Sequence, residues 1–222
     1  MKTCQVVPAV ACLLLWSGAA LAQDPVKVAP EVYKVVVDNP SVRVLRVSLP
    51  AGAKTVMHQH PDHVVIPLTA DKVRFTGPDG KSTDAALPVE SATFIPAGSH
   101  MGTNIGAAAV DAIVVEFKGA AGKATVPSSR DGMAIKMLAE HARAVAYRST
   151  AGPDFQEAAG TKHDYDQVVI ALNAAPMSLS VGGKPAKTTW ARGDVQFIGR
   201  GEVHESKNTG GKPVDFIIVA VK

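Results

Sequence analysis

The feature of this sequence that most constrains its fold is an internal repeat. Residues 214–222 repeat residues 110–118 at a spacing of 104 positions, and residues 168–172 repeat residues 64–68 at the same spacing. The spacing also relates two pairs of polar residues, His100 with His204 and Asn104 with Asn208. Self-similarity at a fixed spacing predicts one structural unit written twice.

Nearer the start of each copy the spacing becomes 100, where residues 143–152 resemble residues 43–52. Four residues are therefore inserted between Gly152 and His163 in the second copy. Residues 119–129 are rich in Gly, Ala and Ser, which is typical of a linker. We expect one domain over residues 23–118 and a second over residues 130–222.

The apolar runs within each copy are short, rich in Val and Ile, and separated by turn residues, which favours β-strands. Residues 72–76 alternate polar and apolar side chains, and residues 77–80 then supply a Gly-Pro-Asp-Gly turn. Residues 139–146 are rich in Ala and by propensity alone favour a helix. Their counterparts, residues 39–46, contain Pro40 and three valine or leucine residues suited to a strand, so we expect strand in both copies.

Residues 1–22 have the layout of a secretory signal: Lys2, an apolar run, and small residues ending at Ala22, after which we expect cleavage. An uncleaved anchor is less well supported, because Pro8 interrupts an apolar run shorter than the roughly 20 residues that span a bilayer. A lipoprotein processed at Cys12 is less well supported, because it would leave the better cleavage site after Ala22 unused. We expect a periplasmic or secreted protein with no membrane span after signal removal.

Both cysteines, Cys4 and Cys12, lie inside this segment, so the mature chain would carry no thiol and no disulfide. The formal charge is +3, with Lys and Arg scattered among Asp and Glu rather than gathered in a basic stripe. This pattern predicts no nucleic-acid partner.

Four of the seven histidines lie in two short stretches of the first copy. On a strand, residues i and i+2 face the same side, so His58 and His60 can present two imidazoles to one point while Gln59 faces away. His100, on a distant strand, can complete the set. Neutral imidazole is a common ligand of transition metals. The sequence therefore predicts one divalent transition metal bound by His58, His60 and His100.

These stretches resemble the two motifs of the cupin superfamily over nearly the whole mature chain. The first motif, a glycine, five residues and a His-x-His pair, is matched by Gly52, His58 and His60. The second is matched by Pro96, Gly98, His100 and Asn104, with one residue fewer than usual between the glycine and the histidine. The resemblance implies an all-β chain of two tandem antiparallel jelly-roll barrels, with the metal in the first.

The chain departs from the family where a ligating glutamate is usual, because Val64 and Val65 stand there. The nearest candidate is His63, which is either a fourth ligand or an exposed turn histidine at the barrel mouth. If His63 is not a ligand, it is a candidate general base, provided its pKa lies near the working pH. An all-histidine site favours Ni, Cu, Zn or Fe over Mn, without distinguishing among them. Residues that could support the ligands are Asp62, Glu90 and Glu116.

The second copy retains Gly201, His204 and Asn208, but Lys162 and Asp164 occupy the positions of the histidine pair. His163 lies between them, so strand parity would turn it outward unless a bulge intervenes. The weak candidates for a second site are thus His204, Asp164 and His163. We favour a degenerate barrel retained for packing.

Two functions are compatible with these residues. The first is an exported metalloenzyme that acts on a small molecule as a dioxygenase, isomerase or decarboxylase, the activities that the cupin resemblance implies. The second is a non-catalytic module that binds or senses a small ligand or a metal. The sequence leaves the substrate and the oligomeric state open. We expect Asn104 to shape a turn and the isolated His141 to be a surface or cap residue.

Overall fold

The computed structural model describes residues 23–69 and 71–222. The predicted signal segment, residues 1–22, lies outside the described residues. The described chain is all-β apart from α1 (Pro25–Val28), a single turn with Asp24 as its N-cap. Within these ranges no helix is long and apolar enough to cross a membrane.

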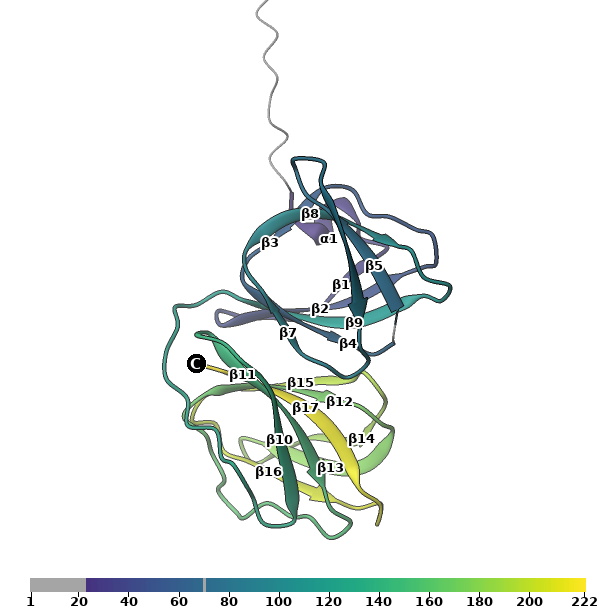
Figure 1. The fold of residues 1–222 in the computed structure, drawn as a ribbon. Helices are drawn as coiled ribbons and strands as arrows, with labels where there is room; N and C mark the ends of the chain where they lie inside the picture. Colours follow the sequence, from purple (N-terminus) through teal and green to yellow (C-terminus); the bar gives the residue numbers. More distant parts are fainter. Residues whose placement is uncertain (1–22, 70) are drawn as a thin grey trace, which may run out of the picture.

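The N-terminal half forms two antiparallel sheets (Figure 1). A five-stranded sheet has the order β1-β2-β9-β4-β7, and a four-stranded sheet has the order β3-β8-β5-β6. The strands are β1 (Tyr33–Asp38), β2 (Val42–Leu49), β3 (His58–His60), β4 (His63–Pro67), β5 (Asp71–Thr76), β6 (Ser82–Leu87), β7 (Thr93–Ile95), β8 (Gly98–Asn104) and β9 (Val110–Phe117).

The C-terminal half repeats this arrangement with one strand fewer among the described residues. Its five-stranded sheet has the order β10-β11-β17-β12-β15, and its second sheet has the order β14-β13-β16. The strands are β10 (Met133–Glu140), β11 (Ala144–Ala151), β12 (Asp166–Ala171), β13 (Ala175–Val181), β14 (Lys184–Trp190), β15 (Val195–Ile198), β16 (His204–Asn208) and β17 (Val214–Val221). Residues 139–140 end β10 and residues 144–146 begin β11, so the predicted strand is confirmed except at residues 141–143, which connect the two strands. Residues 162–164, the counterpart of β3, form no strand.

The five-stranded sheets of the two halves face each other (Figure 1). One core cluster contains residues of both sheets, among them Val44, Ile113, Val168 and Val219. Two further clusters fill the space between the sheets within each half. On β9, alternate residues serve different clusters, because successive side chains of a strand point to opposite faces. This double burial explains why β9 and β17 are apolar at almost every position.

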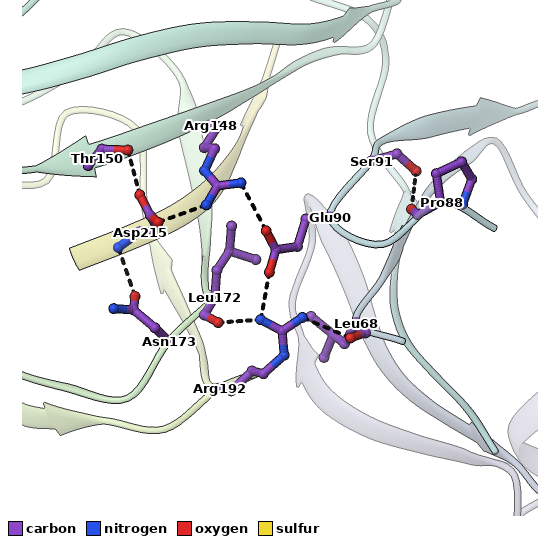
Figure 2. Close-up of polar contacts among 10 residues, drawn as sticks. All are labelled: Leu68, Pro88, Glu90, Ser91, Arg148, Thr150, Leu172, Asn173, Arg192 and Asp215. Carbon is purple, nitrogen blue, oxygen red and sulfur yellow. Dashed lines mark hydrogen bonds and ion pairs between the residues drawn. The ribbon is translucent and has the colours of Figure 1, made fainter. Parts of the chain in front are cut away.

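Polar groups border the interface between the halves, as Figure 2 shows. The Glu90 carboxylate accepts hydrogen bonds from Arg148 at 2.9 Å and from Arg192 at 2.7 Å. Arg192 also donates to the Leu68 carbonyl oxygen at 2.8 Å. Glu90 was one candidate for supporting the metal ligands, and the structure instead places it between the halves. Each half remains open at its sheet edges in the hydrogen-bond pairing.

Candidate metal centre

Strands β3 and β8 bring together the three histidines predicted to share a metal. His58 lies directly opposite His100 in the register of this pair. His58 and His60 are buried while Gln59 between them is exposed, as the two-residue period of a strand requires. One nitrogen of each of His58, His60 and His100 lies within 4.8 Å of the others. We call these three residues the first cluster.

Hydrogen bonds fix the orientation of the imidazole rings at this site. Nδ1 of His58 lies 2.8 Å from the Val56 carbonyl oxygen, and Nδ1 of His60 lies 2.6 Å from Oε1 of Glu116. Since a carbonyl or carboxylate oxygen can only accept, each Nδ1 carries the proton and donates it. In the neutral ring, Nε2 then carries a lone pair and is the atom that can bind a metal.

The surroundings favour the neutral form of the His58 and His100 rings. Burial, with the neighbouring His58 adding to it, lowers the pKa of His100 to about 3. Burial also lowers the pKa of His58 below its ordinary value. A ring that is unprotonated at neutral pH can bind a cation without first releasing a proton. The donor set therefore fits a divalent transition metal ion.

His63 lies beside the first cluster. It begins β4 and is 3% exposed, so the alternative of an exposed turn histidine is wrong. The turn at Pro61 and Asp62 resets the strand phase, and the His63 ring lies 4.9 Å from that of His60 between centroids. Its Nδ1 donates to the Pro61 carbonyl oxygen at 2.8 Å. Burial, followed by the effect of His60, lowers the pKa of His63 to about 4.

A series of charged groups supports the His60 ring at its Nδ1 atom. Glu116, on β9, is 1% exposed and also accepts a hydrogen bond from Nε of Arg43 at 2.5 Å. Arg43 in turn pairs with Asp24. Burial raises the pKa of Glu116, but the hydrogen bonds from His60 and Arg43 outweigh it and hold this pKa below its usual range. The carboxylate therefore stays ionised and holds the His60 ring.

The other residues singled out from the sequence have structural roles. Asp62 accepts a hydrogen bond from the backbone N–H of Ala97 at 2.8 Å, which holds the chain just before β8. The Asn104 amide donates to the carbonyl oxygens of Leu49 and Ala108, in the turn-shaping role predicted for it. The His141 ring stacks on Phe94, at 5.2 Å between centroids, away from the first cluster.

Tyr33 belongs to the site and was missed in the sequence. Its hydroxyl lies 3.0 Å from Nε2 of His58, and burial raises its pKa well above the ordinary value. The protonated hydroxyl therefore donates to the lone pair that a metal would take. No motif contains Tyr33, because it reaches the site through the pairing of β1 with β2, and no local pattern could have indicated it.

A cavity of about 540 Å³, including its opening, adjoins the first cluster. Tyr33, His60, His63 and His100 line it together with apolar side chains of both sheets of the N-terminal half, among them Phe75. No Lys or Arg is among the described residues that line it. Its mostly apolar walls suit an apolar body.

A second cluster, made of Glu157, His163 and His204, lies in the C-terminal half. One ligand atom of each lies within 4.8 Å of the others. The expectation that His163 faces outward is wrong, because residues 162–164 form no strand and strand parity does not apply to them. Asp164 is exposed and accepts a hydrogen bond from the Thr125 backbone N–H at 3.2 Å, outside the cluster.

Glu157 was not predicted, and its position shows how the insertion is divided. The Glu157 N–H donates to the Ser206 carbonyl oxygen, as the Thr55 N–H donates to that of Gly102. Glu157 is thus the counterpart of Thr55 at a spacing of 102. Two of the four inserted residues therefore precede it and two follow it. The sequence contains the insertion, but no residue pattern indicates where it is split.

No model of a protein family matches the sequence, and no curated protein does either. Among solved structures, AerE from Microcystis aeruginosa is similar with a TM-score of 0.65 and 11% identity, over 86% of this chain and 97% of that one. A cupin 2 conserved barrel domain protein from Leptotrichia buccalis is similar with a TM-score of 0.57 and 13% identity, over 86% and 88%. A variant of salicylate 1,2-dioxygenase from Pseudoaminobacter salicylatoxidans gives a TM-score of 0.62 and 9% identity, over 88% and 79%. This chain therefore has the fold of the cupin superfamily.

Proposed function

We propose that this chain binds one divalent transition metal ion through His58, His60 and His100 and acts on a small molecule in the adjoining cavity. The observation that carries the proposal is the arrangement of the rings. Buried imidazoles of β3 and the half-buried imidazole of His100 on β8 converge, and those of His58 and His60 donate their Nδ1 protons to fixed oxygen acceptors. Such second hydrogen bonds orient metal-ligating histidines in known sites.

The donors indicate the class of metal. The first cluster contains only imidazole nitrogens, and Glu116 already accepts from both His60 and Arg43. Imidazole donors suit iron, nickel, copper and zinc, whereas a carboxylate ligand would favour manganese. His63 is the fourth candidate ligand. Its pKa of about 4 makes it a weak base at neutral pH, so the condition for a general-base role is not met.

The cavity indicates the class of substrate. With no Lys or Arg among its described lining residues, it offers a carboxylate or phosphate no cation except a bound metal. We therefore propose a substrate with an apolar body and one metal-chelating end. A bound metal would supply Lewis-acid polarisation or dioxygen activation. The protein would orient the apolar body, exclude water and place the Tyr33 hydroxyl beside the reacting end.

For the reaction, we propose a class of chemistry rather than a particular substrate. A dioxygenase is among the solved structures that share the fold, and isomerase or decarboxylase chemistry suits the same kind of site. The alternative is a non-catalytic module that holds a ligand or a metal for recognition. Oxygen consumption by the metal-loaded protein, with a panel of diols, flavonoids, hydroxy acids and thiols, would indicate a dioxygenase. Conversion of a panel member without oxygen consumption would indicate isomerase or decarboxylase chemistry, whereas a binding module would convert none of them.

The organisation of the chain is part of the proposal. We propose two tandem jelly-roll barrels, over residues 23–118 and 130–222, joined by the linker at residues 119–129. The repeated sheet order of the two halves supports this division. We also propose export with cleavage after Ala22. Mass spectrometry of the mature protein from the periplasm or medium would identify its first residue and test the cleavage site.

The metal assignment is tested by His100→Ala. We expect about one metal ion per chain in the parent and a content well below that in the variant, while circular dichroism shows the β fold unchanged. His141→Ala is the matched control, since it removes an imidazole that stacks on Phe94 outside the cluster. If His100→Ala retains the parent metal content, the ligands have been assigned wrongly.

A further inference from the structure

The guanidinium of Arg130 lies within the second cluster. Its Nη2 donates to Nε2 of His163 at 2.8 Å, and its Nη1 donates to Oε1 of Glu157 at 3.1 Å. The Arg130 side chain is largely buried, and so is that of Glu157. The arginine thus engages a nitrogen lone pair and a carboxylate oxygen, which are the atoms that a metal ion would need.

The remaining histidine of the second cluster is oriented as the histidines of the first cluster are. Nδ1 of His204 lies 3.2 Å from the carbonyl oxygen of Glu202, two residues earlier, as Nδ1 of His58 does with that of Val56. Nε2 of His204 therefore points towards Glu157, at 3.7 Å from Oε1, and lies 3.5 Å from the amide nitrogen of Gln167. Two imidazoles and one carboxylate form a donor set that binds iron, zinc or manganese in other proteins.

Two charges of like sign cannot share this space. A guanidinium remains protonated at every physiological pH, so Arg130 is a permanent cation. It pairs with the Glu157 carboxylate and adds to the effect of burial, which lowers the pKa of His163 to about 4. A divalent ion could bind only after the arginine side chain had moved away.

The first residue after the linker supplies this cation. Arg130 directly follows residues 119–129, and Thr125 of the same segment donates a backbone hydrogen bond to Asp164. The first copy has no equivalent, because the residue 100 positions before Arg130 is Pro30. The difference between the two clusters is therefore a cation contributed by the chain between them.

We propose that Arg130 takes the place of the metal ion in the second cluster, so that the C-terminal half contains a closed metal site. Withdrawal of Arg130 would open Glu157, His163 and His204 to a divalent transition metal. The opened site would face a cavity of about 460 Å³ that Arg130, Glu157 and His204 line together with apolar side chains such as Trp190 and Phe216.

The test counts zinc ions in a background where the first cluster is disabled. His100→Ala protein, incubated with excess Zn²⁺ and desalted, should retain far less than one zinc per chain by elemental analysis. Adding Arg130→Met, which keeps a long unbranched side chain without charge, should raise the content to about one. A further His204→Ala should remove that ion again. Arg74→Met is the control, since Arg74 pairs with exposed Asp84 on the surface.

Three outcomes would overturn the proposal. The first is a parent protein that binds two zinc ions per chain. The second is a folded Arg130→Met variant that gains no zinc. The third is an Arg130→Lys variant, in which the positive charge remains, that gains as much zinc as Arg130→Met. If Arg130→Met does not fold, Arg130→Gln removes the charge with a polar side chain and carries the same expectation. A parent that binds no zinc would contradict the proposed function and leave this inference standing.

Discussion

The buried carboxylate of Glu116 gives the sharpest test of how the first cluster is held. It accepts hydrogen bonds from Nδ1 of His60 at 2.6 Å and from Nε of Arg43 at 2.5 Å. The substitution Glu116→Gln keeps the shape of the side chain but removes its charge. It also replaces one acceptor oxygen with an NH₂ group that cannot accept. Either His60 or Arg43 then loses its acceptor in a buried setting.

Two magnitudes follow for Glu116→Gln. Removing the carboxylate partner of a metal-ligating histidine lowers metal affinity about 10- to 100-fold, which is about 1.4 to 2.8 kcal/mol. Breaking a buried ion pair by removing one partner costs about 3 to 5 kcal/mol of folding free energy. Arg43 keeps its contact with Asp24, so we expect the lower end, about 3 kcal/mol.

The assays are a Zn²⁺ competition titration against a chelator and urea unfolding of the metal-free protein. Asp111→Asn is the matched control, because Asp111 also lies on β9 and pairs with an arginine, Arg46, but is far more exposed. The control should lose no more than about 1 kcal/mol of stability and no metal affinity. Parent-like zinc affinity in Glu116→Gln, together with loss of zinc in His100→Ala, would refute the idea that Glu116 orients His60.

Two further predictions concern pH and the interface between the halves. The metal-free protein should lose stability as the pH falls from 6.5 towards 4, because the unfolded chain binds a proton at His63 before the folded chain does. At about 1.4 kcal/mol per pH unit, His63 alone contributes a loss of roughly 3 kcal/mol. Urea unfolding at both ends of this range measures the loss, and His63→Gln should reduce it; an unchanged slope would contradict the assignment. Glu90→Gln removes the carboxylate that Arg148 and Arg192 share, and we expect a cost of about 1 kcal/mol that shrinks in high salt, with unchanged zinc content. Thermal unfolding at low and high salt checks this expectation, and a cost that is insensitive to salt would argue against an electrostatic role for Glu90.

Local periodicity was enough to predict the face that carries the first cluster. His58 and His60 are two residues apart on β3, so the period of a strand places them on one side without any knowledge of the sheet. Strand register decided the rest of the site. The pairing of β4 with β9 places Glu116 opposite His63, and its carboxylate contacts the ring of nearby His60. Tyr33 reaches His58 from β1. Sequence patterns of a few residues contain no information on such long-range pairings.

The second copy shows where reasoning from a repeat stops being valid. His204 and Asn208 lie at the predicted spacing because β16 pairs within its sheet as β8 does in the first copy. Between Gly152 and His163, the spacing of 104 no longer identifies counterparts, because the insertion is divided around Glu157. The residues between the insertion and β12 form no strand, although the carbonyl oxygens of Thr161 and His163 accept hydrogen bonds from the N–H groups of His204 and Gly201. These contacts are out of step with the spacing of 104. His163, which parity turned outward, therefore faces inward, and Glu157 rather than Asp164 supplies the carboxylate of the second cluster. A repeat thus predicts side-chain direction only for residues that are paired in both copies.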